Sequence, residues 1–258
     1  MNDFKNIKAI IFDLDGTLYS GNHAMPYAVE TVTYLKQKGY EVFYLTNNST
    51  RTPAQIKTKL DGLGFSAGVE RVCSSLSASI TYLKHQKIQS VYCVGMKELI
   101  IQLQANGITV VNDTDALASA QAVLVGMDSD LSYKKIADAY LIFQLNDKCK
   151  LIACNLDRSY PVENGVRLPG CGAGVAAIEN ACEKKMDYIV GKPNAYMLEL
   201  LSEEWRLNKD ELLLVGDTLD SDIAMANSFG CKGVLISDKK HADSVLTIPS
   251  IEILQKWL

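Results

Sequence analysis

Short, unbroken apolar runs alternate with helical patterns along most of the chain, and this alternation restricts the fold more than any other feature. The runs are KAIIF (8–12), EVFYL (41–45), SVYCV (90–94), AVLVG (122–126), KLIAC (150–154), DYIVG (187–191), ELLLVGD (211–217) and KGVLIS (232–237). Strands that are apolar on both sides belong to parallel sheets whose two faces are covered by helices. The sequence therefore predicts an α/β fold with a Rossmann-like, doubly wound parallel-sheet core.

The segments between these runs carry helix signals. One helix is predicted to begin at Pro26 and to end near Gly39, since proline suits the first turn and glycine the residue after the end. In a second helix, Thr52 is the predicted N-cap and Pro53 the first helical residue. These signals support the alternation of strands and helices.

The composition limits the kinds of binding partner and the cellular compartment that we expect. The chain has 258 residues, of which 48% are hydrophobic and 22% charged, and its net charge is -4. This acidic balance argues against a nucleic-acid binder, which would carry a basic face, and no apolar run approaches the ~18 residues of a membrane span. The N-terminal MNDFKNIK lacks the apolar core of a signal peptide, and the seven cysteines are scattered without a CxxC pair. We therefore predict a cytoplasmic protein that binds neither nucleic acid nor membrane. A homodimer is kept open, because the composition does not determine the oligomeric state.

In a doubly wound sheet, binding sites gather at the carboxyl ends of the strands. The first run ends at Asp13 and Asp15, and the second is followed by TNNS (46–49). Lys192 follows DYIVG, and DTLDSD (217–222) follows ELLLVG. The other strand ends offer fewer polar groups. These four polar strand ends are therefore expected to assemble one site.

The middle of the chain contributes none of these four strand ends. Residues 82–186 carry their own alternation of apolar runs and helices. We therefore predict two domains: a core formed by residues 1–81 and 187–258, and a cap domain formed by residues 82–186.

Asp13, Asp15 and Asp217 are predicted to form a cluster whose ligands are all oxygen atoms. Two like charges ~4 Å apart repel by roughly 4 kcal/mol at an effective dielectric constant of ~20. A cation between the carboxylates offsets this repulsion, and Mg²⁺ binds through a few carboxylates together with water. The sequence therefore predicts Mg²⁺ as the cofactor.

The neighbouring groups suit a phosphate. Thr46, Asn47 and Lys192 supply a hydroxyl, an amide and an ammonium, which are donors for phosphate oxygens. A carboxylate facing a phosphate can attack it to form an aspartyl-phosphate, and a second one, two residues on, can act as acid and base. Each motif alone is more often a solvated turn or a helix cap, but their joint position at strand ends favours a catalytic site.

Four segments in this order resemble the motifs of the haloacid dehalogenase (HAD) superfamily of phosphatases. They are DLDGTL (13–18), TNNS (46–49), GKP (191–193) and GDTLDSD (216–222). The long segment between the second and third motifs resembles a C2-type cap, and NLDRSYPVENGVRLPGCGA (155–173) resembles the NagD-like and p-nitrophenylphosphatase-like family. The resemblance implies a Rossmann-like core with an inserted α/β C2-type cap domain.

The resemblance also implies roles for individual residues. Asp13 would be the nucleophile, Asp15 the general acid and base, and Lys192 a partner of the nucleophile and the phosphate. Thr46 and Asn47 would hold the transferring phosphoryl group. Dehalogenases of the superfamily lack an acid at the position of Asp15, so its presence favours phosphoryl transfer.

The metal ligands implied by the resemblance are Asp13, Asp15, Asp217 and Asp222. Asp15 would contribute its backbone carbonyl, and Asp217 would bind Mg²⁺ directly or through water. Asp222 would support the ion from nearby.

The polar loop DRSYPVENGVR (157–167) is the expected specificity element of the predicted cap. Family members close such loops over the substrate, so Asp157, Arg158, Tyr160 and Arg167 would contact the leaving group and select it. The alternative is that the loop is a solvated turn without contact to the substrate. Some relatives carry a histidine where this chain has Tyr160, which leaves the natural substrate open.

The leading hypothesis is a Mg²⁺-dependent phosphatase that hydrolyses small phosphomonoesters, such as sugar phosphates or nucleoside monophosphates, through an aspartyl-phosphate. The expected partner is thus a small phosphorylated metabolite. The alternatives are a phosphotransferase and a non-hydrolytic phospho-ligand sensor on the same scaffold. A sensor would show the loss of Asp13, Asp15 or Lys192, and all three are present.

Overall fold

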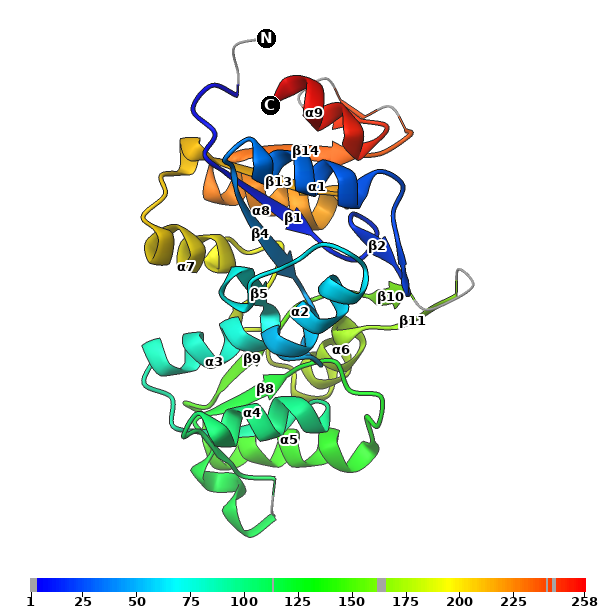
Figure 1. The fold of residues 1–258 in the computed structure, drawn as a ribbon. Coiled ribbons are helices and arrows are strands. Elements are labelled where there is room, and N and C mark those ends of the chain that lie inside the picture. Colours follow the sequence, from blue (N-terminus) through cyan, green and yellow to red (C-terminus); the bar gives the residue numbers. More distant parts are fainter. Residues whose placement is uncertain (1–3, 113, 162–165, 240, 243–244) are drawn as a thin grey trace.

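Two parallel sheets, one above the other in Figure 1, form the molecule. The computed structural model describes residues 4–112, 114–161, 166–239, 241–242 and 245–258. Helices cover both sheets, and the predicted α/β fold with a doubly wound parallel core is confirmed. Within the described ranges, no helix combines the length and the apolar character that crossing a bilayer requires.

The larger sheet has six strands, and every neighbouring pair is parallel. From edge to edge they are β15 (Thr247–Ile248), β14 (Lys232–Ile236), β13 (Leu212–Gly216), β1 (Ala9–Asp13), β4 (Glu41–Thr46) and β5 (Val72–Ser74). The chain runs from β1 toward β4 and β5, and it later fills the other side with β13 to β15. The carboxyl ends of β4, β1 and β13 therefore lie side by side at the switch point, where α/β sheets bind ligands.

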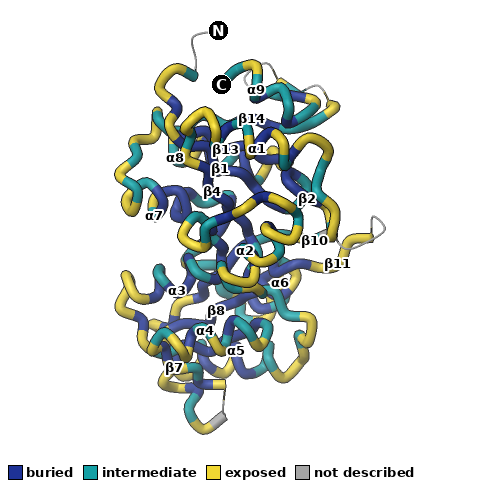
Figure 2. Tube along the Cα trace, in the orientation of Figure 1, coloured by how far each residue is buried: buried dark blue, intermediate teal, exposed yellow. Residues whose placement is uncertain are grey.

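Helices cover both faces of this sheet because its strands are apolar on both sides. Ile10 and Phe12 of β1 pack into one buried cluster, and Ala9 and Ile11 into another. The first face is covered by α1 (Ala28–Gln37), α2 (Pro53–Gly62) and α9 (Leu254–Trp257), and the second by α3 (Ser75–His85), α7 (Tyr196–Trp205) and α8 (Ala224–Phe229). Figure 2 shows the strands buried between exposed outer helix faces.

The helix signals in the sequence are largely confirmed. Thr52 caps α2: its hydroxyl accepts from the backbone of Gln55, and the Gln55 side chain accepts from the backbone of Thr52. The first helix begins two residues later than Pro26, at Ala28, because Tyr27 has a left-handed backbone with φ 62°.

The smaller sheet has five parallel strands, with helices on both faces. Its elements are β12 (Tyr188–Ile189), β9 (Lys150–Ala153), β8 (Ala122–Val125), β6 (Ser90–Val94), β7 (Thr109–Val110), α4 (Lys97–Ala105), α5 (Tyr133–Leu145) and α6 (Cys171–Cys182). Two antiparallel hairpins complete the fold: β2 (Tyr19–Ser20) with β3 (His23–Ala24), and β10 (Ser159–Pro161) with β11 (Arg167–Pro169).

One strand lies in a different sheet from the one expected. Residues 187–191 were predicted to begin the second part of the core, but Tyr188 and Ile189 pair with Ile152 and Ala153 of β9. The Asp187 carboxylate strengthens this pairing by accepting a hydrogen bond of 2.7 Å from the backbone of Leu151. The division into domains itself stays a prediction.

Candidate active site

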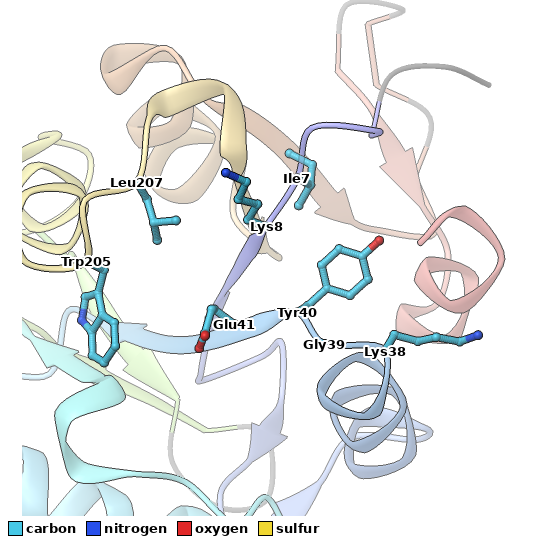
Figure 3. Close-up of a pocket in the computed structure, with 8 residues that line it drawn as sticks. All are labelled: Ile7, Lys8, Lys38, Gly39, Tyr40, Glu41, Trp205 and Leu207. Atoms are coloured by element: carbon cyan, nitrogen blue, oxygen red, sulfur yellow. The ribbon is translucent and has the colours of Figure 1, made fainter.

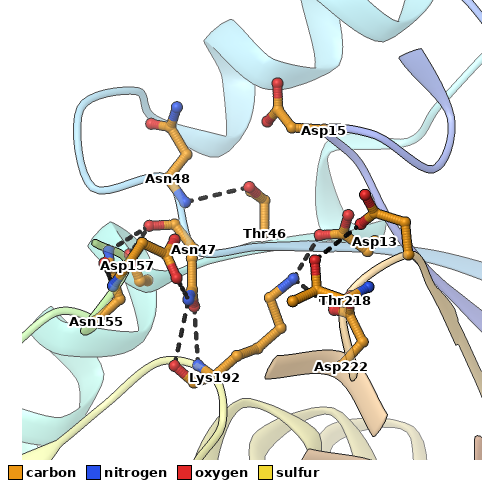
Figure 4. Close-up of polar contacts among 12 residues, drawn as sticks. Asp13, Asp15, Thr46, Asn47, Asn48, Asn155, Asp157, Lys192, Thr218 and Asp222 are labelled. Atoms are coloured by element: carbon orange, nitrogen blue, oxygen red, sulfur yellow. Dashed lines mark hydrogen bonds and ion pairs between the residues drawn. The ribbon is translucent and has the colours of Figure 1, made fainter. Parts of the chain in front are cut away.

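The carboxyl ends of the three central strands bring the predicted catalytic groups together. Asp13 ends β1, Thr46 ends β4, and Asp217 follows β13. Lys192 enters from the segment after β12 and ends beside Asp13 (Figure 4). Asp13 and Lys192 are each only 5% exposed, so both charges are almost fully removed from water.

The Lys192 ammonium lies between two buried carboxylates. Its Nζ atom donates to Oδ1 of Asp13 at 2.5 Å and to Oδ1 of Asp222 at 2.7 Å. The other carboxylate oxygen of Asp222 accepts from the backbone of Thr218 at 3.0 Å. A buried charge without a partner is strongly destabilising, so these three side chains hold one another in a single arrangement.

The electrostatics favour a charged lysine beside Asp13, the predicted nucleophile. Burial raises the pKa of the Asp13 carboxyl, and the ammonium of Lys192 opposes that shift. For Lys192, burial lowers the pKa, but Asp13 and Asp222 outweigh burial and hold it above its ordinary value. Lys192 therefore stays protonated near neutral pH and favours the ionised form of Asp13 that a nucleophile requires.

Three carboxylates near this lysine fit a divalent cation. Asp13, Asp217 and Asp222 each offer one oxygen, and these three oxygens lie within 4.8 Å of one another. Three carboxylates face one ammonium, which leaves an excess of negative charge for a cation to balance. The side chain of Asp15 is not part of this group, and neither is that of Asp220.

Two glycines allow these carboxylates to approach the strand ends. A Cβ atom on Gly16 would lie 2.2 Å from Oδ2 of Asp217, and Gly16 also has a φ of +95°. A Cβ atom on Gly216 would lie 2.2 Å from Cγ of Asp222, although Gly216 has an ordinary backbone. The position of Asp222 beside Lys192 therefore depends on a missing side chain at residue 216.

Gly216→Ala is expected to lower kcat by about a hundredfold, because a shift of ~1 Å in a catalytic group has an effect of that size. The added methyl group would push Asp222 away from Lys192. Steady-state kinetics on protein of verified fold measures this effect, with Gly62→Ala as the matched control, since a Cβ there meets nothing within 4 Å. A Gly216→Ala variant with wild-type kcat would show that the position of Asp222 is irrelevant to turnover.

Asp15 stands apart from the lysine and its carboxylates, above Thr46 in Figure 4. The hydroxyl of Tyr19 donates to its Oδ2 atom at 3.4 Å. Burial raises the pKa of Asp15, and the charges of Lys59 and Lys192 oppose this shift. A carboxyl with a raised pKa suits a group that must carry a proton before it can protonate a leaving group.

Comparison with known proteins identifies the family. A family model described as haloacid dehalogenase-like hydrolase matches residues 10–109, and a HAD-hydrolase-like model matches residues 189–252. The glycerol-3-phosphate phosphatase of Rattus norvegicus is 33% identical over 255 residues, which cover 89% of this chain and 78% of that protein. The chain belongs to the haloacid dehalogenase-like hydrolases. The superfamily predicted from the four motifs is thus confirmed.

Solved structures share the fold of this HAD-like hydrolase over nearly its whole length. A protein from Pyrococcus horikoshii OT3 has 32% sequence identity and a TM-score of 0.86, and the match covers 97% of this chain and 99% of that one. A glycerol phosphate phosphatase from Mycobacterium tuberculosis, solved in complex with magnesium, has 27% identity and a TM-score of 0.80. That match covers 93% of this chain and 71% of the other.

The side chain of Asn47 contacts Lys192 and Asp157 in this hydrolase, and its role toward the phosphoryl group stays a prediction. Its Oδ1 atom accepts from the backbone of Lys192 at 2.8 Å, and its amide nitrogen donates to the Lys192 carbonyl and to Asp157. Its backbone carbonyl accepts from Asn155 and Ser75. Both polar atoms of the Asn47 side chain thus contact protein groups, and they position Lys192.

Sequence reasoning missed Asn155, Ser75 and Tyr19. A signal existed for Asn155, because it directly follows the apolar run 150–154 and so stands at a strand end. Ser75 and Tyr19 had no such signal, because their contacts with Asn47 and Asp15 depend on the three-dimensional fold.

The predicted specificity loop joins the site at one residue. Asp157 is half-buried and accepts from Asn47 at 2.9 Å. Arg167 donates to the side chain and the backbone of Ser159 across the hairpin, whereas Arg158 is exposed and Tyr160 half-buried. Residues 162–165 of this loop lie outside the described ranges.

A hollow of about 550 Å³ lies at the amino ends of β1 and β4, at the end of the larger sheet opposite to the candidate site (Figure 3). It is lined by Ile7, Lys8, Lys38, Gly39, Tyr40, Glu41, Trp205 and Leu207. Lys8 and Glu41 precede or begin strands, and ion pairs with Glu211 and Arg71 balance their charges. The hollow is therefore separate from the catalytic strand ends.

Proposed function

We propose that this hydrolase is a Mg²⁺-dependent phosphatase that hydrolyses small phosphomonoesters through a covalent phosphate on Asp13. The observation that carries this proposal is the Lys192 ammonium, held between the buried carboxylates of Asp13 and Asp222. A lysine in this place holds a nucleophilic carboxylate ionised and offers positive charge to a phosphate. The glycerol-3-phosphate phosphatase among the relatives supports the same reaction class.

Asp13, Asp217 and Asp222 are the proposed holders of the metal ion, with the carbonyl of Asp15 as a further ligand. Bound Mg²⁺ supplies positive charge that offsets the charge of the phosphoryl oxygens. The magnesium in the structure of the Mycobacterium tuberculosis relative supports this cofactor. Lys192 alone balances only one of the three carboxylates.

In the first proposed step, a carboxylate oxygen of Asp13 attacks the phosphorus atom, and the bond from phosphorus to the ester oxygen breaks. Asp15 gives its proton to that oxygen, so the leaving group departs as an alcohol. The Thr46 hydroxyl, the ammonium of Lys192 and the backbone at Asn47 would hold the transferring phosphoryl oxygens.

In the second proposed step, a water molecule attacks the phosphorus atom of the phosphorylated Asp13. The carboxylate of Asp15 accepts the proton that the water loses. The bond from phosphorus to the Asp13 oxygen then breaks, and inorganic phosphate leaves. Asp13 ends as a carboxylate and Asp15 as an acid, so both return to their starting forms.

Further assignments from the sequence belong to this proposal. Asp157, Arg158, Tyr160 and Arg167 would contact the leaving group from the cap, and the cap itself would be residues 82–186. The cytoplasmic location is supported by the seven cysteines, all of which are free thiols.

A turnover screen tests the proposed function. We expect the purified chain to release inorganic phosphate from several small phosphomonoesters when Mg²⁺ is present, and from p-nitrophenyl phosphate as a generic substrate. A folded protein that hydrolyses none of these esters in Mg²⁺ would contradict the proposal and favour the sensor. Transfer of the phosphoryl group to an added alcohol, in place of water, would favour a phosphotransferase.

A further inference from the structure

Asn155 lies where the two sheets meet, and it has no role in the steps above. It follows β9 of the smaller sheet by two residues, and its side chain is buried. Its Nδ2 atom donates at 2.6 Å to the backbone carbonyl of Asn47, which directly follows β4 of the larger sheet (Figure 4). Its Oδ1 atom accepts from the backbone of Asp157 at 3.0 Å. One side chain thus links the end of a strand in one sheet to the end of a strand in the other.

The carbonyl of Asn47 is held by a second donor from the opposite side of this junction. Ser75, the first residue of α3 on the larger sheet, donates to the same oxygen through its hydroxyl at 2.7 Å. Ser75 is 0% exposed and Asn155 only 3%, so water does not compete for these bonds. A carbonyl oxygen accepts two hydrogen bonds, and both are strong in a buried environment. The backbone of Asn47 is therefore fixed by one donor from each sheet.

The side chain of Asn47 passes this fixed position on to Lys192. Its amide forms two hydrogen bonds with the Lys192 backbone, here called the amide clamp: Oδ1 accepts from the N–H at 2.8 Å, and Nδ2 donates to the carbonyl at 3.2 Å. The chain is closely packed at this point, since a Cβ atom on Gly191 would lie 2.5 Å from Oδ1 of Asn47 and 2.6 Å from the Cys154 carbonyl oxygen. A shift of Asn47 would therefore move the main chain from which Lys192 reaches Asp13.

We propose that Asn155 and Ser75 are positioning residues of the catalytic centre, which act through the backbone of Asn47. They hold its carbonyl in place, Asn47 holds the Lys192 backbone through the amide clamp, and the ammonium thereby stays beside Asp13. This inference rests on the proposed function, because it assumes that the ammonium contributes to turnover. It gives the end of β9 a function in the reaction that the proposed steps leave out.

The first test measures kcat for p-nitrophenyl phosphate with Mg²⁺ in two variants that change no charge. Ser75→Ala removes one donor to the Asn47 carbonyl, and we expect kcat to fall by about fivefold, the effect of one hydrogen bond. Asn155→Ala also leaves space for Asn47 to move, so kcat should fall by at least about tenfold. Wild-type kcat in both variants would overturn the inference.

Asn146→Ala is the matched control for Asn155→Ala. Asn146 follows α5 and forms the same pair of bonds away from the site: its Nδ2 atom donates to the Ala120 carbonyl at 3.0 Å, and its Oδ1 atom accepts from the backbone of Lys148 at 3.1 Å. The control should lower the midpoint of thermal unfolding and leave kcat unchanged. If it lowered kcat as much as Asn155→Ala does, the loss would reflect stability alone and the inference would fail.

A double-mutant cycle tests whether Asn155 acts through the amide clamp. Asn47→Ala removes the clamp, so Asn155 has no connected route to Lys192 in this background. Adding Asn155→Ala to Asn47→Ala should then change kcat by less than about twofold, because residues that act in series are not additive. If Asn155→Ala kept its full effect in this background, it would act by another route, such as the loop at Asp157, and the inference would be overturned.

A spectroscopic measurement follows Lys192 without turnover. In protein labelled with carbon-13 at the lysine Cε atoms, the Lys192 signal is identified by its absence from Lys192→Met. We expect this signal to shift in Asn155→Ala and in Ser75→Ala but not in Asn146→Ala. A signal that stays in place in the first two variants would overturn the inference, whatever happens to kcat. A folded wild-type protein that hydrolyses no ester would instead overturn the proposed function itself.

Discussion

Asp13→Asn is expected to abolish phosphatase turnover while the protein stays folded. The amide is nearly the same shape but a poor nucleophile, so the covalent route is lost. Phosphate monoesters hydrolyse so slowly in water that enzymes accelerate the reaction by up to ~10²¹-fold. We therefore expect kcat to fall by at least about 10³-fold, as it does when other catalytic nucleophiles are removed.

The fold should survive because Lys192 keeps Asp222 as a partner at 2.7 Å in this variant. Circular dichroism and the midpoint of thermal unfolding measure this directly. Asp220→Asn is the matched control, since Asp220 is an exposed carboxylate in the same strand-end segment and lies outside the group of Asp13, Asp217 and Asp222. If Asp13→Asn retained more than a tenth of the wild-type kcat, Asp13 would not be the nucleophile.

Removal of the divalent cation is expected to stop turnover completely and reversibly. Without it, Asp13, Asp217 and Asp222 face each other with Lys192 as the single counter-charge among them. Mg²⁺ should restore activity after EDTA treatment, and Ca²⁺ should not. Ca²⁺ accepts 6–8 ligands at about 2.3–2.6 Å, so it would bind both oxygens of Asp13 and occupy the attacking one.

A second measurement of the metal needs no substrate. Mg²⁺ that binds the folded protein raises its free energy of unfolding, by about 2.7 kcal/mol at a hundred times Kd. The midpoint of thermal unfolding should therefore rise with added Mg²⁺, and by less in Asp217→Asn. Full activity in excess EDTA, together with an unfolding midpoint that does not change when Mg²⁺ is added, would refute the assignment of the metal.

The meeting of Asp13 and Asp217 was predictable because parallel strands carry their carboxyl ends to the same end of a sheet. Asp13 and Asp217 follow apolar runs whose strands are neighbours in the sheet, so their positions in the chain predicted their meeting in space. The helix cap at Thr52 was equally predictable, because capping depends on residues close in sequence. Nothing beyond local patterns and one rule of α/β topology was needed for these elements.

Other contacts could not be predicted, since they join segments that sequence patterns do not relate. The two-residue strand β12 gives no signal of whether it pairs with β9 or with the larger sheet. The side chain of Asn47 was expected on phosphate, but its contacts with Lys192 and Asp157 require the packing of the two sheets to be known. The contact of Lys59 with Tyr19 likewise depends on how α2 packs against β2, the short strand that contains Tyr19.

Chemical trapping of the phosphorylated enzyme tests the central claim most directly. The Asp15→Asn variant would be mixed with p-nitrophenyl phosphate, whose leaving group needs little protonation, and then quenched in acid and reduced with borohydride. Without the base at residue 15, hydrolysis of the covalent intermediate should be slow, so the phosphorylated form should accumulate. We predict that mass spectrometry finds homoserine, the product of reducing a phosphorylated aspartate, at position 13. Release of p-nitrophenol with no modification at Asp13, or with the phosphoryl group on another residue, would contradict the account.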